Sequence, residues 1–600
     1  MNYTCQLILA SFLAFSAGIS TSSAEKIGPG LLQRLNQSSI SIATARVQEQ
    51  TIPVIVEFSD KINLHNLRGN KKNRRKELLR EIKAQHKISQ RSIRRLLRQY
   101  GISRKESLWL INGLSFDAPI SLINDLVAEP TVQQIRLDYQ IMAPAIGTGG
   151  SAPAEWNLNR IGTSALWDMG ITGFGVVVAN MDTGVDFNHS QLSSTWRGGS
   201  NSWYDPHCQA APWQNPVLFQ AAGSCPANTD FSIPRDRAGA STGHGSQTMG
   251  IMVGGVAADT GTSIGVAPDA QWIATKIFND DGAASLTAIH KAFQWLLDPD
   301  NDPLTDDAPD IVNASWVLAG ESVNQCVLEF QADIQALKAV DIAVVFAAGN
   351  EGGAANPYTS TSPGNNPEGY AVGAVDSLDR AASWSSRGPG PIGPGNSTTA
   401  CSNGFFPELM APGVAVRTTN KNAISSIDSY VSVSGTSFAA PHVAGAMALL
   451  LDAVPNLSVS DLENIIMNTA HETVNADDAI GADDIYGFGV LDVEAAYYAQ
   501  CPVDGLDSDS DGIPDVCDNC TMKVNPWQED TDGDLFGDIC DGDLDNNGIV
   551  NFGDINVMFG LLGQNGPAGD FDNNQIVNFG DINVMFGFLN NPPGPSGLVQ

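Results

Sequence analysis

Three short segments of this 600-residue chain carry the side chains that hydrolysis of an amide requires. Asp182 opens an Asp-Thr-Gly segment, His244 lies between two glycines, and Ser437 precedes an Ala-rich run. A hydroxyl becomes nucleophilic when an imidazole takes its proton, and a carboxylate can orient that imidazole. Each residue alone has a commoner explanation, as a turn residue, a loop residue or a helix N-cap. Together and in this order, with Asn350 between them, they predict a hydrolytic site.

The surrounding pattern predicts the scaffold that positions these residues. Short β-branched runs, of which 176–179, 272–275 and 342–346 are the clearest, alternate with Gly-rich turns and helical segments. This alternation is typical of an α/β unit, with a mostly parallel sheet and helices on both faces. Active sites on such sheets lie at the carboxyl ends of the strands. Ser437 should begin a helix, where free N–H groups and the helix dipole favour an oxyanion.

The segments around these residues resemble the subtilisin-like serine proteases, or subtilases, over roughly residues 156–500. The resemblance implies that Ser437 is the nucleophile and that His244 acts as general base and then as general acid. Asp182 would fix the imidazole tautomer, and Asn350 would donate its side-chain NH₂ to the oxyanion. The fold implied is a subtilisin-like α/β fold, and the activity is that of a serine endopeptidase.

Two positions depart from the family pattern. Gln247 stands where a second His is common, and Phe438 stands where Met is common. Neither is a reacting group, so we expect changed packing with activity kept. His189 and His442 are expected to be structural.

The substrate cleft is inferred from the same resemblance. Segment 315–317, with Ser315 and Trp316, would form an edge strand that pairs with an extended peptide and accepts many sequences. Val317 follows where the family usually has Gly, which leaves the depth of the primary pocket open. Thr361 would lie at the floor of that pocket, and a small polar floor tolerates large apolar side chains.

The N-terminus predicts secretion. Residues 1–24 combine a short apolar run with small residues before a cleavage point, which is typical of a signal peptide, although no basic residue precedes the run. No later stretch predicts a membrane span. Removal of Cys5 with the signal leaves eight of the nine cysteines, an even number suited to an oxidising compartment. Sequence order suggests the pairs Cys208–Cys225, Cys326–Cys401, Cys501–Cys517 and Cys520–Cys540, although order alone does not determine connectivity.

Charge is distributed very unevenly along the chain. The whole has 32 Lys+Arg against 66 Asp+Glu, a net charge of −34, which excludes nucleic-acid binding as the main activity. Residues 25–150 hold 20 basic and 11 acidic residues, whereas residues 151–600 hold 12 and 55. Either the first segment docks on the second, or the two have independently solvated faces.

Residues 25–142 read as a small α+β unit before a linker at 143–155. The strands are expected at 52–58, 108–111 and 132–137, and the helices at 71–98 and 122–126. By resemblance this unit is a pro-domain that assists folding and plugs the cleft, so it is itself a partner of the enzyme. The self-cleavage would fall in or just before 143–153.

The acidic C-terminal part predicts calcium binding. In residues 501–541, aspartates recur twice at offsets 1, 3, 5, 9 and 12, and alternating carboxylates supply the oxygens that calcium prefers. These residues are Asp507, Asp509, Asp511, Asp515 and Asp518, then Asp530, Asp532, Asp534, Asp538 and Asp541. With their cysteines they resemble thrombospondin type 3 repeats. Leu535 replaces a usual Gly, so the second loop should bind calcium more weakly.

Residues 542–592 contain a duplicated unit that resembles a dockerin, followed by a tail at 593–600. Each copy has an EF-hand-like loop and then apolar residues at helical spacing, which are expected to form a core between the copies. The ligands expected in the two loops are Asp543, Asp545, Asn547 and Asp554, then Asp570, Asp572, Asn574 and Asp581. Gln575 stands where the first copy has Gly548, which makes the second sharp turn harder. A disordered acidic tail is the alternative, and a cohesin-like partner is left open.

The sequence therefore predicts a secreted, self-processing, calcium-dependent serine endopeptidase acting on protein or peptide substrates. One rival is a catalytically silent adhesion or matrix protein, which the presence of all four site residues disfavours. Another is a dedicated processing protease that cuts few partners.

Overall fold

The computed structural model describes residues 26–42, 50–64, 67–148, 155–214, 225, 229–257, 260–318, 323–353, 359–388, 406–421, 429–471, 483–500, 506–511, 513–525, 536–564, 569–571, 574 and 576–596. The signal-peptide prediction for residues 1–24 lies outside the described residues. Among the helices described, none combines the length and the apolarity that crossing a bilayer requires.

The middle of the molecule is built on a seven-stranded sheet in which every neighbouring pair is parallel. Its order is β14 (Leu409–Pro412), β13 (Ala371–Val375), β12 (Ala343–Ala347), β11 (Ile311–Ala314), β7 (Val177–Asp182), β9 (Gln271–Lys276) and β8 (Trp203–Tyr204). The three strands expected from the β-branched runs are β7, β9 and β12, so this prediction is confirmed.

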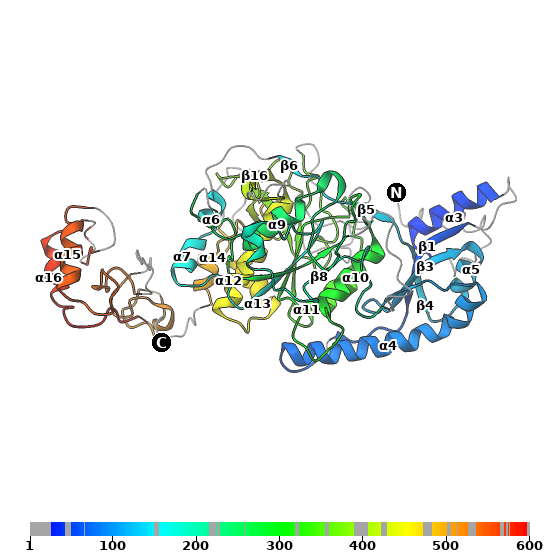
Figure 1. Ribbon diagram of the computed structural model, residues 1–600, viewed down its shortest axis with the longest axis horizontal. Helices are drawn as coiled ribbons and strands as arrows, with labels where there is room; N and C mark the ends of the chain where they lie inside the picture. The colour runs from blue at the N-terminus through cyan, green and yellow to red at the C-terminus, as the bar shows by residue number, and fades with distance from the viewer. Residues whose placement is uncertain are drawn as a thin grey trace.

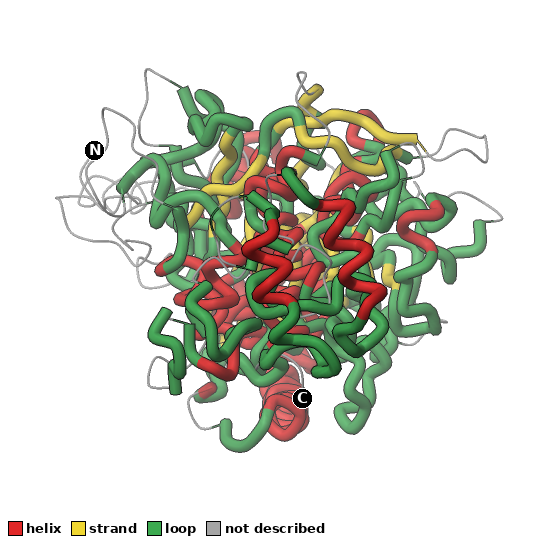
Figure 2. Tube along the Cα trace, turned by 90° about the vertical axis from the view of Figure 1, so that its left-hand side faces the viewer, coloured by secondary structure: helices red, strands yellow, loops and turns green. Residues whose placement is uncertain are grey.

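Helices cover both faces of this sheet because successive strand residues point to opposite sides. On β7, Val178 packs with α9 (His244–Val253) and α12 (Thr436–Ala453), whereas Ala179 packs with α10 (Leu286–Leu297) and α11 (Gln331–Lys338). The predicted α/β class is therefore confirmed (Figure 1). Figure 2, which looks at the molecule from the end where its C-terminal part lies, shows helices and loops in front of the strands. The shorter helices of this region are α6 (Trp156–Arg160), α7 (Thr163–Asp168), α8 (Ser190–Ser193), η2 (Gly239–Ser241), α13 (Val459–Asn468) and α14 (Val493–Tyr498).

The N-terminal unit has an antiparallel sheet of its own. Its order is β2 (Glu106–Leu108), β3 (Gly113–Pro119), β1 (Thr51–Phe58) and β4 (Val132–Leu137), with helices α3 (Pro29–Ile42), α4 (Lys71–Gln99) and α5 (Ile120–Ala128). The expected strand at 108–111 is wrong. Strand β2 ends at Leu108, and the chain turns at Asn112, whose φ is 52°. The Trp109 side chain is buried outside any strand, with its ring edge-on to Trp213 at a centroid distance of 5.6 Å.

Two short strands connect the N-terminal unit to the middle domain. β5 (Gln140–Met142) pairs antiparallel with β10 (Ala283–Ser285). β6 (Gly147–Thr148) pairs with β16 (Ser429–Ser434), whose other neighbour is β15 (Val416–Asn420). The expected linker at 143–155 therefore contains a strand, which its composition of small residues did not reveal.

In the C-terminal part, the described elements are the short helix η3 (Asp515–Cys517) and the helices α15 (Phe552–Leu561) and α16 (Phe579–Met585). Residues from both copies of the duplicated unit share one small apolar core, as expected, but Phe559 and Phe586 of the predicted stripes are half exposed. The pairs Cys208–Cys225 and Cys520–Cys540 are disulfide-bonded as predicted. The other two expected pairs include Cys401 and Cys501, which lie outside the described residues, as do Leu535 and Gln575.

Candidate active site

Asp182 and His244 form a buried pair at the carboxyl end of the central strand. Asp182 is the last residue of β7, and His244 is the first of α9. Nδ1 of His244 lies 2.8 and 2.9 Å from the two carboxylate oxygens of Asp182, and both side chains are fully buried. This contact fixes the imidazole ring. Its other nitrogen, Nε2, is buried and has no hydrogen-bond partner among the described residues.

A second buried carboxylate, which the sequence analysis missed, holds the start of α9. Asp236 accepts hydrogen bonds from the backbone N–H of Gly243 and from both the N–H and the hydroxyl of Ser246. It also accepts from the hydroxyl of Thr183, the residue after Asp182. Burial raises the pKa of Asp236, and these hydrogen bonds oppose that rise. Asp236 thus ties the helix that carries the imidazole to the turn that carries its carboxylate.

The glycine after His244 allows this close packing. A Cβ at Gly245 would lie 2.1 Å from the carbonyl oxygen of Gly184 and 3.1 Å from Cβ of Asp182. Any larger residue would force the helix away from β7. Glycine at position 245 is therefore a steric requirement of the Asp182–His244 contact.

Ser437 lies at the start of α12 and is almost fully buried. Its hydroxyl donates to the carbonyl oxygen of Ser315 at 3.2 Å, and the Ser315 hydroxyl donates to the carbonyl oxygen of Ser437 at 2.8 Å. The expected contact between Ser437 and the imidazole is therefore not made in this structure, because the hydroxyl has found a backbone acceptor. The next residue, Phe438, lies against the His244 ring with centroids 5.4 Å apart.

Asn350 follows β12 and meets the start of the same helix. Its Oδ1 accepts from the backbone N–H of Thr436 at 3.0 Å and from the Thr436 hydroxyl at 3.1 Å. Thr436 directly precedes Ser437. With the amide oxygen fixed in this way, the NH₂ group points elsewhere, and it donates no hydrogen bond within the described part of the chain. The side chain is exposed.

A chain of buried polar residues runs beneath the site. Asn180, two residues before Asp182, donates to Gly245 O at 3.0 Å and to the Thr248 hydroxyl at 2.9 Å. Asn313 on β11 donates to Asn180 Oδ1 and to the Ser315 hydroxyl, both at 3.0 Å. This chain links β7, β11 and α9. The sequence analysis missed both asparagines, although a polar residue inside an apolar strand was an available signal.

The expected substrate residues are only partly where the sequence analysis placed them. Strand β11 ends at Ala314, so segment 315–317 is not a strand here. The Trp316 ring is buried and packs edge-on against Phe330 and Phe346, which leaves its backbone rather than its side chain for a substrate. Thr361 is buried and donates to Ala348 O at 2.7 Å, close behind Asn350.

The histidines expected to be structural are so. His442 is buried between Phe438 O and the Asn157 side chain, each 2.8 Å away, and burial lowers its pKa to about 4. His189 Nε2 lies 3.0 Å from Ser429 O.

Two groups of predicted calcium ligands gather in the C-terminal part. Asp507, Asp509 and Asp511 form one, and Asp543, Asp545 and Asp554 form the other; within each group, one oxygen from every residue lies within 4.8 Å of the others. Carboxylate oxygens at this spacing suit calcium.

Several other expected calcium ligands make hydrogen bonds within their own loops. Asp515 accepts from Ser508 N, Asp518 from Cys520 N and Asp570 from Asn574 N, while Asn547 N donates to Asp543. Asp581 caps α16, and Asp538 and Asp541 are buried. The remaining four, Asp530, Asp532, Asp534 and Asp572, lie outside the described residues.

The basic N-terminal unit docks on the acidic middle domain, which is the first of the two alternatives left open by the charge distribution. Most of the ion pairs across this interface come from α4. They are Lys71–Asp310, Arg74–Asp341, Arg75–Asp306, Arg75–Asp307 and Lys83–Asp298, with Arg136–Glu329 from β4 and Glu106–Lys291 in the opposite sense.

Comparisons with known proteins agree with this geometry. A family model described as "Subtilase family" matches residues 173–489, more than half of the chain. Bacillopeptidase F of Bacillus subtilis (strain 168) is 31% identical over 423 residues, which are 67% of this chain and 26% of that protein. Subtilisin DY of Bacillus licheniformis is 34% identical over 255 residues, covering 42% of this chain and 77% of that protein. The chain thus spans about a quarter of bacillopeptidase F and about three quarters of subtilisin DY.

Proposed function

Because this chain belongs to the subtilase family, we propose that it is a secreted serine endopeptidase that cleaves peptide bonds with Ser437 as nucleophile. One observation carries the assignment of roles. The imidazole of His244 is held by Asp182 through one nitrogen, while its other nitrogen is buried, has no hydrogen-bond partner in the described part of the chain, and lies near helix α12, whose second residue is Ser437. A general base needs such an accepting nitrogen.

In the proposed mechanism, rotation of the Ser437 side chain moves its hydroxyl from Ser315 O to His244 Nε2. The imidazole takes the proton as the oxygen attacks the scissile carbonyl, and Asp182 stays ionised and stabilises the imidazolium. The resulting oxyanion accepts from the Asn350 NH₂ and from backbone N–H at the start of α12. His244 then protonates the leaving amine, and water repeats the sequence on the acyl-enzyme.

Substrate binding is proposed to rely on backbone pairing. β10 already pairs antiparallel with β5, an extended segment that precedes the expected cleavage region, and the carbonyl oxygen of Ser315, at the start of segment 315–317, lies 3.2 Å from the Ser437 hydroxyl. Main-chain hydrogen bonds of this kind bind many sequences, which supports broad specificity.

The path of the chain supports self-processing of residues 25–142 as a pro-domain. Ala143 N donates to Gly282 O at 2.8 Å, next to β10. A few residues later, Gly147 pairs with Ser434, which lies three positions before the nucleophile. Residues 143–146 therefore join β5 to β6, and β6 pairs with β16, which ends three residues before Ser437, so we place the cleaved bond among them.

Calcium is proposed as a structural ion of the C-terminal part, bound at the two aspartate groups described there. It would neutralise carboxylates that otherwise repel one another, and it takes no part in the chemical step. The thrombospondin-like and dockerin-like assignments of residues 501–592 belong to the same proposal.

Processing tests the proposal directly. Ser437→Ala expressed in a protease-free host should accumulate the uncut chain, whereas the parent and the matched control Ser432→Ala should yield a new N-terminus between residues 143 and 147. Normal maturation of Ser437→Ala would disprove self-processing.

Casein clearing tests the activity itself. Clearing by the purified parent that a serine-directed inhibitor abolishes would indicate a broad endopeptidase, and would argue against a silent scaffold and against a narrow processing enzyme. The same assay with a chelator tests calcium dependence.

A further inference from the structure

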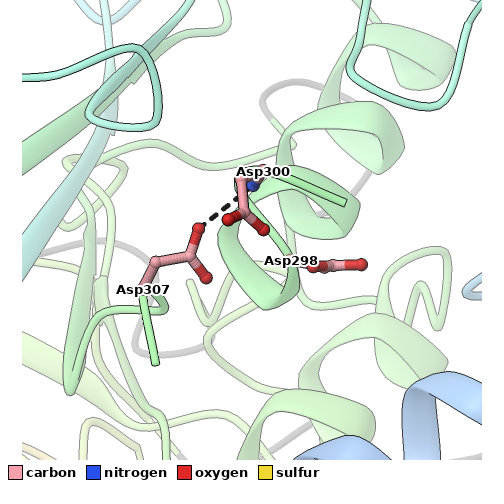
Figure 3. A group of neighbouring side chains, drawn as sticks. All are labelled: Asp298, Asp300 and Asp307. Atoms are coloured by element: carbon pink, nitrogen blue, oxygen red, sulfur yellow. Dashed lines mark hydrogen bonds between the residues drawn. The ribbon is translucent and has the colours of Figure 1, made fainter. Parts of the chain in front are cut away.

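The loop between α10 and β11 carries a third aspartate group, away from the active site and from the C-terminal part. Residues 298–307 contain five aspartates in ten positions. Asp298, Asp300 and Asp307 each offer an oxygen, and these oxygens all lie within 4.8 Å of one another (Figure 3). The backbone N–H of Asp300 donates to Asp307 Oδ2 at 3.1 Å, which ties the two ends of the loop together.

Cations of the N-terminal unit hold this aspartate group in the uncut chain. Lys83 of α4 pairs with the Asp298 carboxylate and donates to Asn301 Oδ1 at 2.8 Å. Arg75, itself 3% exposed, pairs with Asp307 and donates to Leu297 O at 3.0 Å. Two cations of the N-terminal unit thus offset part of the charge of the three carboxylates. Arg197 of the middle domain, which donates to Asp307 O at 2.7 Å, also interacts with the charges of Asp300 and Asp307.

One carboxylate oxygen of Asp298 has no partner in the part of the chain that the structure describes. The Asp298 side chain is fully buried, with a relative exposure of 0%, and its Oδ1 has no hydrogen-bond partner among the described residues. A buried carboxylate oxygen without a donor is unfavourable in a protein that binds nothing there. It retains the capacity to coordinate an ion.

We propose that this aspartate group is a calcium site that is completed when the N-terminal unit leaves, and that calcium and helix α4 compete for it. The inference rests on the proposed removal of residues 25–142. Departure of α4 takes away Arg75 and Lys83, so the three carboxylates repel one another more strongly, with Arg197 of the middle domain still beside Asp307. It also frees two neutral oxygens that flank Asp298, Asn301 Oδ1 and Leu297 O.

The geometry and donor type select the ion. Calcium takes six to eight oxygens at roughly 2.3–2.6 Å, and three carboxylates whose oxygens lie within 4.8 Å of one another can face one such ion. The donors are all oxygens, which favour calcium over zinc. Since Arg75 and Lys83 bind only in the uncut or still associated state, calcium binding and retention of the N-terminal unit oppose each other, and this opposition is reciprocal.

The first test needs no processing. In the Ser437→Ala full chain, which keeps its N-terminal unit, calorimetric titration with calcium gives the number of bound ions. Arg75→Ala/Lys83→Ala in that background should bind one ion more per chain, and adding Asp298→Asn should remove it. Arg74→Ala is the matched control, because its partner Asp341 lies outside the aspartate group. An unchanged ion count in the folded double variant would overturn the proposal. If loss of the buried Arg75 unfolds the unit, Lys83→Ala alone serves.

The second test uses the processed protein. Calcium should raise the Kd of the cleaved N-terminal unit for the processed enzyme, by roughly the 5–150-fold typical of coupling between two sites. Asp298→Asn should lose this calcium effect, whereas Asp341→Asn, which also loses an ion pair to α4, should keep it. An equal calcium effect on the Kd in both variants would contradict competition at this loop. If no processing occurs at all, the proposed function fails while the first test still decides the calcium site.

Discussion

Two buried histidines of this molecule make nearly the same contact and differ in one nitrogen. His244 on α9 lies 2.8 Å from Asp182 through Nδ1, and His290 on α10 lies 2.8 Å from Asp333 through Nδ1. Nε2 of His290 lies 3.0 Å from a second carboxylate, that of Glu329. Nε2 of His244 has no such partner among the described residues. Nε2 of His244 is therefore able to accept a proton, whereas both nitrogens of His290 already face carboxylates.

The pKa of His290 agrees with the presence of carboxylates at both of its nitrogens. Burial alone would lower the pKa of His290, but the charges of Asp333 and Glu329 and their hydrogen bonds outweigh it and raise the pKa to about 9. The ring is then protonated at neutral pH and donates from both nitrogens. Arg136 of the N-terminal unit also contacts Glu329, so this site is an ion-pair network at the interface.

The largest effect is expected when His244 is replaced. His244→Ala should lower kcat by about 10⁶-fold, the magnitude seen in subtilisin itself when its triad histidine is removed. His290→Gln, at the other carboxylate-bound ring, should keep kcat within about tenfold because it touches no reacting atom. Hydrolysis of a chromogenic peptide measures both, with circular dichroism to confirm folding. A folded His290→Gln enzyme as inactive as His244→Ala would invalidate the distinction.

A smaller effect is expected for Asn350, the oxyanion donor proposed for the same site. Asn350→Ala removes the NH₂ that has no other use in the described structure, so kcat should fall by about 10²–10³-fold with little change in KM, a range that comes from the equivalent donor of subtilisin. The exposed Asn464→Ala on α13 is the matched control. A change confined to KM would show that Asn350 binds substrate and does not stabilise the oxyanion.

The smallest effect concerns pH and the His290 site. The pKa of this ring is about 9 when folded against an ordinary 6.5, so its stabilising contribution is fully present below pH 6.5 and disappears as pH rises through 9. The contribution to the free energy of unfolding is on the order of 3 kcal/mol. Denaturant titrations of uncut Ser437→Ala between pH 6 and 9 measure it. His290→Gln should flatten the dependence of the free energy of unfolding on pH in this range. Asp333, Glu329, Asp138 and Arg136 also surround the ring, and an unchanged pH dependence would assign it to these neighbours.

The sequence predicted the parts of this protein that depend on local order. The strand–turn–helix alternation predicted the parallel sheet, and motif order singled out Asp182 and His244, whose side chains lie in contact. The role of Asn350 as an oxyanion donor stays a prediction. The sequence failed where position depends on a distant neighbour. Trp109 lies in a turn with its ring edge-on to Trp213, at a centroid distance of 5.6 Å. Segment 315–317 lies beyond the end of β11, and the Trp316 ring there packs against Phe330 and Phe346.

By itself, the sequence determined the type of chemistry available, the class of fold and the opposite charges of the two docked units. Only the tertiary structure decided which groups surround each ring. The partners of His290 lie 39 and 43 residues away, and that of His244 lies 62 residues away, so no local pattern could show that Nε2 of one ring meets a carboxylate and that Nε2 of the other, within the described residues, does not. Whether an imidazole accepts a proton depends on the charges and hydrogen-bonding groups placed around both of its nitrogens, and folding alone assembles those.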